Sequence, residues 1–153
     1  MSGMSSPSAE APVLAVDEML CLALYQASRS MTARYRLLLG PLGLTYPQYL
    51  VMVLLWQEGE MTVGSIGQRL RLESSTLSPL LKRLEAMGLV DRRRRARDER
   101  AVLVSLQSKG RSLRARAVDV PPTMCDAIGL DDAEQAAFVA RLRELVATLD
   151  GPT

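Results

Sequence analysis

Two short helical segments in tandem are the feature that most constrains the fold of this chain. The first is predicted at 63–70, after the candidate N-cap Thr62, and the second at 76–87, after Ser74 or Ser75. So short a connection between two helices is typical of a helix-turn-helix. The sequence therefore predicts that motif in the middle of the chain.

A basic hairpin is predicted directly after the second short helix. Gly88 ends that helix, and the run 101–106 (AVLVSL) is rich in β-branched residues, which favours a strand. A polar turn at 96–99 would join it to a preceding strand. The predicted tip carries four arginines: Arg94, Arg95, Arg97 and Arg100. A hairpin in this position is the wing of a winged helix-turn-helix.

The rest of the chain is predicted to be mostly helical. Further helices are predicted at 14–39, 46–57, 109–118 and 131–149. Thr45 and Ser108 are candidate N-caps, and Pro121 and Pro122 interrupt the chain. Residues 1–12 are small, polar and proline-containing, which predicts a disordered tail. We expect one mainly α domain with a small β-hairpin over 13–153.

Composition excludes several classes of function. The chain has 153 residues and no histidine, which rules out a Ser-His-Asp triad, a histidine general base and a His-ligated zinc site. We expect no enzyme activity, no cofactor and no metal. No apolar run reaches the roughly 20 residues of a membrane span, so we expect a cytoplasmic protein with no membrane partner. A domain of this size needs no disulfide to fold, which leaves both cysteines available for chemistry.

The positive charge is concentrated in one segment. Residues 71–116 hold 13 Lys and Arg against 5 Asp and Glu, a net charge of +8, and the remainder has a net charge of −6. A basic third in a nearly neutral chain suggests a polyanionic partner, although such a run is also typical of a solvated surface.

The second short helix has the residue order of a DNA-recognition helix. Short polar side chains at its start can reach base edges, and basic side chains further along can reach phosphates. These candidates are Glu73, Ser74, Ser75, Thr76, Lys82 and Arg83. Leu77, Leu80, Leu81 and Leu84 are expected to face the core. Together with the wing, this order favours double-stranded DNA over RNA, for which the six aromatic residues do not form a stacking platform.

Four stretches resemble the organic hydroperoxide resistance regulators, the thiol-sensing branch of the MarR-type repressors. They are LCLALYQASR (20–29), GLTYPQYL (43–50), LSPLLKRLE (77–85) and DER (98–100). The resemblance covers nearly all of 17–149. At the start of the recognition helix this chain has Glu73 and Ser75 where such regulators typically have Asp and Gly, so the preferred DNA sequence is not carried over.

The resemblance implies a homodimer that represses a gene until an organic hydroperoxide oxidises one cysteine. Residues 13–57 and 108–149 would form the dimer, and 62–106 would be the DNA-binding part. Arg100 would enter the minor groove and Asp98 would orient it. The resemblance assigns Cys21 as the peroxidatic thiol, Tyr35 and Tyr46 as hydrogen-bond donors to its sulfur, and Tyr25 as an aromatic neighbour.

Helix geometry restricts how these residues can meet. Cys21 and Tyr35 are 14 residues apart, which is about 21 Å along one straight helix. If they meet, the tyrosine comes from the other subunit. Phenol hydroxyls that donate to sulfur would favour the thiolate, which attacks peroxide to give a sulfenic acid at Cys21.

Cys125 is the candidate resolving cysteine. It lies between Pro122 and Gly129, in a stretch that we expect to be weakly structured and able to move. In the two-cysteine regulators of this type, a late cysteine attacks the sulfenic acid of the opposite subunit. We expect the same of Cys125, with an intersubunit disulfide as the product.

Other hypotheses fit the same sequence. A MarR-type repressor that binds a phenolic or other small acid would leave Cys21 as a packing residue, as buried free cysteines commonly are. A thiol peroxidase would turn over hydroperoxide continuously with a thiol reductant. A helical dimer that serves as a protein adaptor would show no salt-dependent binding to DNA.

Overall fold

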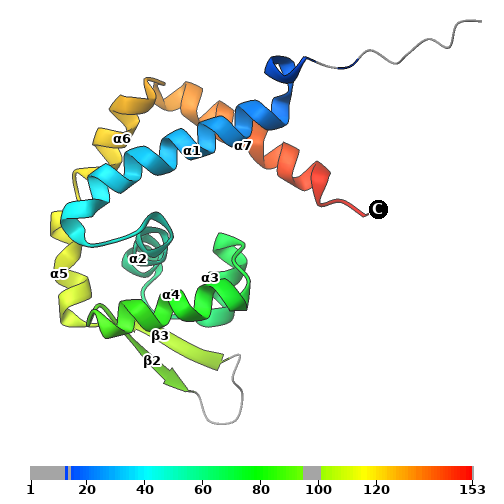
Figure 1. Cartoon of the computed structure of the whole chain (residues 1–153). Helices are drawn as coiled ribbons and strands as arrows, with labels where there is room; N and C mark the ends of the chain where they lie inside the picture. Colours follow the sequence, from blue (N-terminus) through cyan, green and yellow to red (C-terminus); the bar gives the residue numbers. More distant parts are fainter. Residues whose placement is uncertain (1–12, 14, 95–100, 153) are drawn as a thin grey trace, which may run out of the picture. The chain divides into compact units, whose positions relative to one another are not determined.

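The structure is a computed structural model that describes residues 13, 15–94 and 101–152. The expected tail at 1–12 lies outside this range. So does the predicted hairpin tip, with Arg95, Arg97, Asp98 and Arg100. The α-helices and the strands β2 and β3 are labelled in Figure 1.

The chain divides into two compact units, and the division falls inside α1 (Leu20–Leu39), between Arg34 and Tyr35. The first unit holds a single turn of 3-10 helix, η1 (Val16–Glu18), and most of α1. The expected start of the first helix at residue 14 is wrong, because Met19 has an extended backbone (φ −76°, ψ 121°) that separates η1 from α1.

The second unit contains the remaining elements. These are η2 (Gly40–Leu42), α2 (Tyr46–Glu58), β1 (Met61–Thr62), α3 (Val63–Leu70), α4 (Ser74–Ala86), β2 (Val90–Arg94), β3 (Val102–Leu106), α5 (Ser108–Arg116), α6 (Val120–Ile128) and α7 (Asp132–Leu149). The strands form an antiparallel sheet in the order β1-β3-β2, with Arg92 opposite Val104. The fold is therefore mainly α with a small sheet, as the sequence predicts, and β1 extends the hairpin by a third strand.

The predicted helix starts are right where the side-chain cap forms. The Thr45 hydroxyl accepts a hydrogen bond from the Gln48 backbone N–H at 3.3 Å, and the Gln48 side chain accepts one from Thr45 N at 3.0 Å. Thr62 caps α3 by accepting from Ser65 N at 3.1 Å. Ser108 is not a cap, because α5 already begins at that residue.

The N-cap predicted for the second short helix is also wrong. Ser74 and Ser75 lie inside the first turn of α4, and Glu73 occupies the N-cap position without a side-chain hydrogen bond. The turn between α3 and α4 contains Arg71, which has a left-handed backbone (φ 55°) and ends α3 by donating its N–H to Gly67 O. The helix-turn-helix itself is confirmed.

The stretch around Cys125 is a helix, which corrects the expectation of a weakly structured segment. α6 covers Val120–Ile128, with proline in its first turn and Gly129 in the left-handed conformation at its end. Proline is compatible with a first helical turn because no N–H is needed there. Pro121 and Pro122 therefore begin a helix, and Val120 and Met124 bury its inner face.

The core of the second unit is built around α2 and α4. Val51, Met52 and Leu55 of α2 are at most 1% exposed, and Leu81 and Leu84 of α4 are fully buried. By contrast, α7 has no buried residue in this single chain. Within the described residues no single helix is long and apolar enough to span a membrane, although 20–42 and 46–58 pass the test of length and composition as a broken pair.

Candidate DNA interface and thiol site

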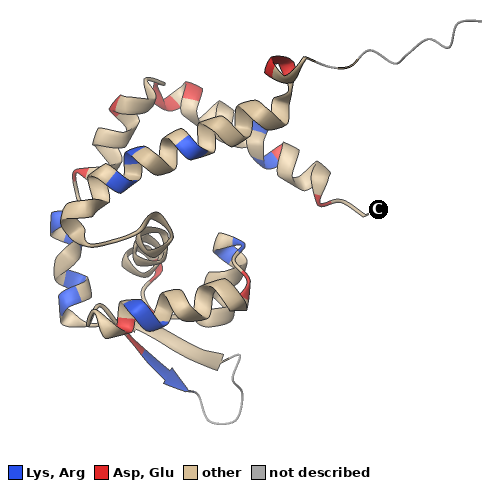
Figure 2. Cartoon of the chain, in the orientation of Figure 1, with Lys and Arg blue, Asp and Glu red and all other residues tan. Residues whose placement is uncertain are grey.

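The helix α4 presents a polar face to solvent and an apolar face to the core. Leu77, Leu80, Leu81 and Leu84 are buried, as predicted. The exposed side chains include the predicted candidates Glu73, Ser74, Ser75, Thr76, Lys82 and Arg83. Figure 2 shows basic residues near the end of α4 and along the strand β2 that follows it. The fold therefore places these side chains on an exposed surface, where a DNA duplex can reach them.

Several of the basic side chains in residues 71–116 make contacts within the protein. Lys109 donates to Met87 O at 2.9 Å, Arg111 to Leu106 O at 2.7 Å and Arg116 to Pro41 O at 2.9 Å. Arg71 forms an ion pair with Asp150, and Arg93 pairs with Asp91 at 3.2 Å. The contacts with backbone carbonyl oxygens fix where these cationic groups lie but leave their charge in place, so the segment remains basic. Of these acids, Asp150 alone lies outside the segment and lowers the charge that a ligand would meet.

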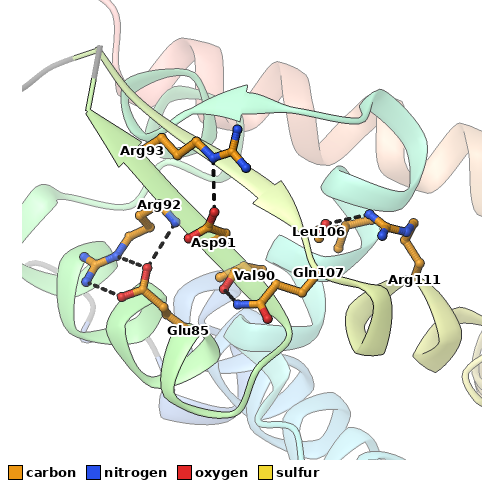
Figure 3. Close-up of polar contacts among 8 residues, drawn as sticks. All are labelled: Glu85, Val90, Asp91, Arg92, Arg93, Leu106, Gln107 and Arg111. Carbon is orange, nitrogen blue, oxygen red and sulfur yellow. Dashed lines mark hydrogen bonds and ion pairs between the residues drawn. The ribbon is translucent and has the colours of Figure 1, made fainter. Parts of the chain in front are cut away.

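Glu85, near the end of α4, binds Arg92 of β2 through both its carboxylate oxygens (Figure 3). Glu85 Oε2 accepts from Arg92 N at 3.0 Å and from Arg92 Nε at 3.4 Å, and Oε1 accepts from Nη2 at 3.3 Å. This pair was not expected from the sequence. The seven-residue spacing across a helix end gives no periodic signal that predicts it.

A hollow of about 740 Å³ lies between the two helices of the helix-turn-helix and the sheet. Its lining includes Gln68 of α3, Arg71 of the turn, Ser74 of α4, Arg92 of β2 and Val102 of β3. A smaller hollow of about 370 Å³ lies between α4 and β2. Of the predicted DNA-binding residues in the hairpin, the structure describes Arg94, which is exposed; Arg95, Asp98 and Arg100 fall in the undescribed segment.

The first thiol lies on the exposed surface of α1. Cys21 is exposed and free, and Tyr25, one turn further along α1, is 60% exposed. The Arg29 guanidinium lies 5.5 Å from the centre of the Tyr25 ring. A solvent-accessible thiol can react with a dissolved oxidant, which a buried structural thiol cannot.

Tyr35 and Tyr46, the two predicted hydrogen-bond donors, stack on each other in the second unit. Their ring centroids are 4.5 Å apart, and the Tyr49 ring lies 5.9 Å from that of Tyr35. Burial and the neighbouring phenols raise the pKa of Tyr35 to about 12, and burial also raises the pKa of Tyr46 and of Tyr49. These side chains are therefore neutral hydroxyl donors near pH 7.

The aromatic cluster continues along α2 beyond the residues that the sequence predicts. Trp56 lies 6.4 Å from the Tyr49 ring, and its indole N–H donates to Gly110 O at 2.9 Å. Tyr49 and Trp56 were missed, although their spacing from Tyr46 along a helix places them near one face. That spacing is equally typical of core packing, so it does not single out a site.

The pKa of Tyr35 is raised mainly by burial, and Cys125 is the last of the neighbouring groups that add to this rise. Both residues belong to the second unit. Cys125 is a partly buried free thiol. The second cysteine and the predicted sensor tyrosine therefore share one neighbourhood within a single chain.

Comparison with known proteins places this geometry among transcriptional regulators. Residues 35–116 match the family described as transcriptional regulator SarA/Rot. The chain is 48% identical over 109 residues to the organic hydroperoxide resistance transcriptional regulator of Bacillus subtilis, covering 71% of this chain and 74% of that protein.

Two solved structures of AbfR, a protein of Staphylococcus epidermidis, are similar in fold. The structure of reduced AbfR bound to DNA has a TM-score of 0.72 and 33% identity, over 86% of this chain and 92% of that one. Disulfide-formed AbfR has a TM-score of 0.63 and 35% identity, over 83% of this chain and 89% of that one.

Proposed function

Because the chain belongs to the organic hydroperoxide resistance regulators of the MarR family, we propose that it represses transcription until Cys21 is oxidised by an organic hydroperoxide. The observation that carries this proposal is the stacked pair of phenols, Tyr35 and Tyr46, of which Tyr35 has Cys125 as a neighbour, in a chain whose other thiol is exposed. In this proposal the protein binds operator DNA in the cytoplasm and is not an enzyme.

The proposed assembly is a homodimer through 13–57 and 108–149, with 62–106 as the DNA-binding part. Large apolar side chains lie exposed on α1 and α7 of the single chain, among them Leu20 (62%), Phe138 (57%) and Leu149 (74%). Such a set of exposed apolar side chains supports an interface between copies. In this dimer, Cys21 of one subunit faces Tyr35 and Tyr46 of the other, which satisfies the helix-length restriction along α1.

The proposed chemistry proceeds in two balanced steps. The Cys21 thiolate attacks the terminal oxygen of the hydroperoxide, so that an S–O bond forms, the O–O bond breaks and the alkoxide leaves as the alcohol after taking a proton. The Cys125 thiolate of the opposite subunit then attacks the sulfenic sulfur, so that an S–S bond forms, the S–O bond breaks and the hydroxide leaves as water after taking a proton. The two thiols lose two electrons and the hydroperoxide gains them.

The neighbourhood of Cys125 and Tyr35 supports resolution between subunits. If Cys21 binds the phenols of the opposite chain, the Cys125 of that same opposite chain is the thiol near the sulfenic acid. The disulfide recorded for AbfR, a relative in fold, agrees with a disulfide as the end product. The two cysteines of the present chain are both free in this structure.

A mobility shift on a duplex from the region upstream of the gene tests the proposal. Reduced wild-type protein should bind, cumene hydroperoxide should release it, and dithiothreitol should restore binding. Cys21→Ser should stay bound after the same treatment. Cys125→Ser is the matched control: it should lose the covalent dimer on a non-reducing gel while Cys21 still forms a sulfenic acid. Release of Cys21→Ser by hydroperoxide would refute Cys21 as the sensor.

The hollow beside α4 supports a second candidate, a repressor that is released by a phenolic or other small acid. Its volume of about 740 Å³ suits a small ligand, and the polar side chains of Gln68 and Ser74 in its lining can donate hydrogen bonds to a carboxylate. Release from DNA by a phenolic acid that persists in Cys21→Ser would favour this candidate over peroxide sensing.

A further inference from the structure

We propose that Glu85 is a positioning residue for the DNA interface, and that it holds the strand of the wing at a fixed place against α4. The inference rests on the proposed DNA-binding function and deepens it. It concerns the joint between the two DNA-facing elements, α4 and β2. The residues that make this joint, Glu85 and Arg92, are not among the predicted DNA contacts.

The joint fixes both the backbone and the side chain of one residue. Glu85 accepts the Arg92 backbone N–H at 3.0 Å and two guanidinium N–H groups at 3.4 and 3.3 Å. The two side chains are 36% and 27% exposed, respectively, so water screens the pair less than it screens a fully exposed ion pair. A bond to the backbone locates the strand, and the bonds to the side chain orient the carboxylate (Figure 3).

Glu85 lies where a carboxylate is otherwise unfavourable. It is the second-to-last residue of α4, and the negative end of the helix dipole repels a negative charge there. The bonds to Arg92 offset that repulsion. The carboxylate at this position therefore stabilises the contact between α4 and β2 and does not stabilise the helix itself.

The other partner, β2, lies at the edge of the sheet. β2 pairs with β3 on one side, and in the described sheet no strand pairs with its other side. The Arg92 N–H donates to Glu85 instead of to a strand. Glu85 therefore takes the place of a neighbouring strand at this edge. Without Glu85, β2 would be held in position by its pairing with β3 alone.

The joint controls the residues that the duplex would meet. Arg94 follows Arg92 by two residues, so their side chains lie on the same face of β2. Arg94 and Ser78 of α4 line the 370 Å³ hollow together with Glu85 and Arg92. The Glu85–Arg92 bonds consequently set the spacing between the outward side of α4 and Arg94. Arg92 acts within the protein and is not a phosphate ligand.

Equilibrium binding by reduced Glu85→Ala and Glu85→Gln tests this role, with a specific upstream duplex and an unrelated duplex in parallel. Glu85→Ala should weaken binding to the specific duplex by about five- to tenfold, and Glu85→Gln by less because its amide oxygen still accepts the Arg92 N–H. Binding to the unrelated duplex should change by less than about twofold, since the phosphate-contacting cations remain. The DNA on either side of the bases that α4 covers should also lose protection from hydroxyl radicals, in parallel with the loss of affinity for the specific duplex.

Glu58→Gln is the matched control, because Glu58 forms an exposed ion pair with Arg69 at 3.3 Å and lies outside both the proposed dimer segments and the proposed DNA-binding part. It should bind like wild type. The double variant Glu85→Arg with Arg92→Glu restores an ion pair but removes the acceptor for the backbone N–H of residue 92. It should therefore bind the specific duplex more weakly than Glu85→Gln does. If wild type prefers the specific duplex and Glu85→Ala keeps that preference, the positioning role is wrong. If reduced wild type shows no preference between the duplexes, the proposed repressor function fails and this inference fails with it.

Discussion

Gly110→Ala should destabilise the protein strongly, because Gly110 packs against the backbone of the residue that precedes β2. A Cβ at Gly110 would lie 2.1 Å from Leu89 O and 3.0 Å from Leu89 C. The Leu89 carbonyl cannot simply turn away, since it accepts the Gln107 N–H at 2.9 Å. Moving Gly110 instead would strain the hydrogen bond from Trp56 to Gly110 O.

The expected loss follows from opposing terms. Forcing backbone apart at such a contact costs about 3 kcal/mol or more, and a strained hydrogen bond adds about 1 kcal/mol. The higher helix propensity of alanine returns about 1 kcal/mol. We therefore expect the free energy of unfolding to fall by about 3 kcal/mol, which lowers the melting temperature by roughly 6–12 °C for a chain of this size.

Thermal and urea unfolding of reduced protein at one fixed concentration measure this loss. Gly40→Ala is the control, because no heavy atom lies within 4 Å of a Cβ built at Gly40. It should unfold within about 0.5 kcal/mol of wild type. Equal midpoints for Gly110→Ala and Gly40→Ala would refute the argument that α5 is fixed against Leu89 by close packing.

Three further results are expected. The pKa of Tyr35 is raised from 10.0 to about 12, so its contribution to the free energy of unfolding is complete below pH 10 and is lost as the pH rises toward 12. In urea unfolding across this pH range, the free energy of unfolding of Tyr35→Phe should therefore decline less steeply than that of wild type. Trp56→Phe keeps a ring but leaves Gly110 O without its donor, so the free energy of unfolding should fall by about 1–2 kcal/mol in the same assay. Lys82→Ala and Arg83→Ala should each reduce the slope of log affinity against log salt by about 1, measured by fluorescence anisotropy on duplex DNA; an unchanged slope would remove that residue from the phosphate contacts.

The order of elements could be predicted because local signals agree with it. Thr45 and Thr62 cap the helices that they were expected to cap, and the four leucines of α4 have the spacing of one buried face. β1 could not be predicted, since Met61 and Thr62 become a strand through pairing with Val104 and Leu103. Two residues carry no periodicity of their own.

The candidate site could be predicted less completely than the fold. The resemblance of the chain to a known family predicted the roles of Cys21, Tyr35 and Tyr46. In the structure the rings of the two tyrosines stack on each other. The Glu85–Arg92 joint depends on where α4 ends and β2 begins. Contacts of this kind arise from tertiary packing, and residue spacing in the sequence does not encode them in a readable way.

The helical state of Cys125 changes what the proposed disulfide requires. A loop cysteine could move at little cost, but Cys125 lies in α6, and its carbonyl accepts the Gly129 N–H that ends the helix at 3.1 Å. A helix of nine residues is not stable by itself in water, so packing of Val120 and Met124 must hold α6 in place. Any displacement of Cys125 toward a sulfenic acid therefore competes with the burial of those two side chains. Weakening that packing should speed disulfide formation without changing the first oxidation of Cys21.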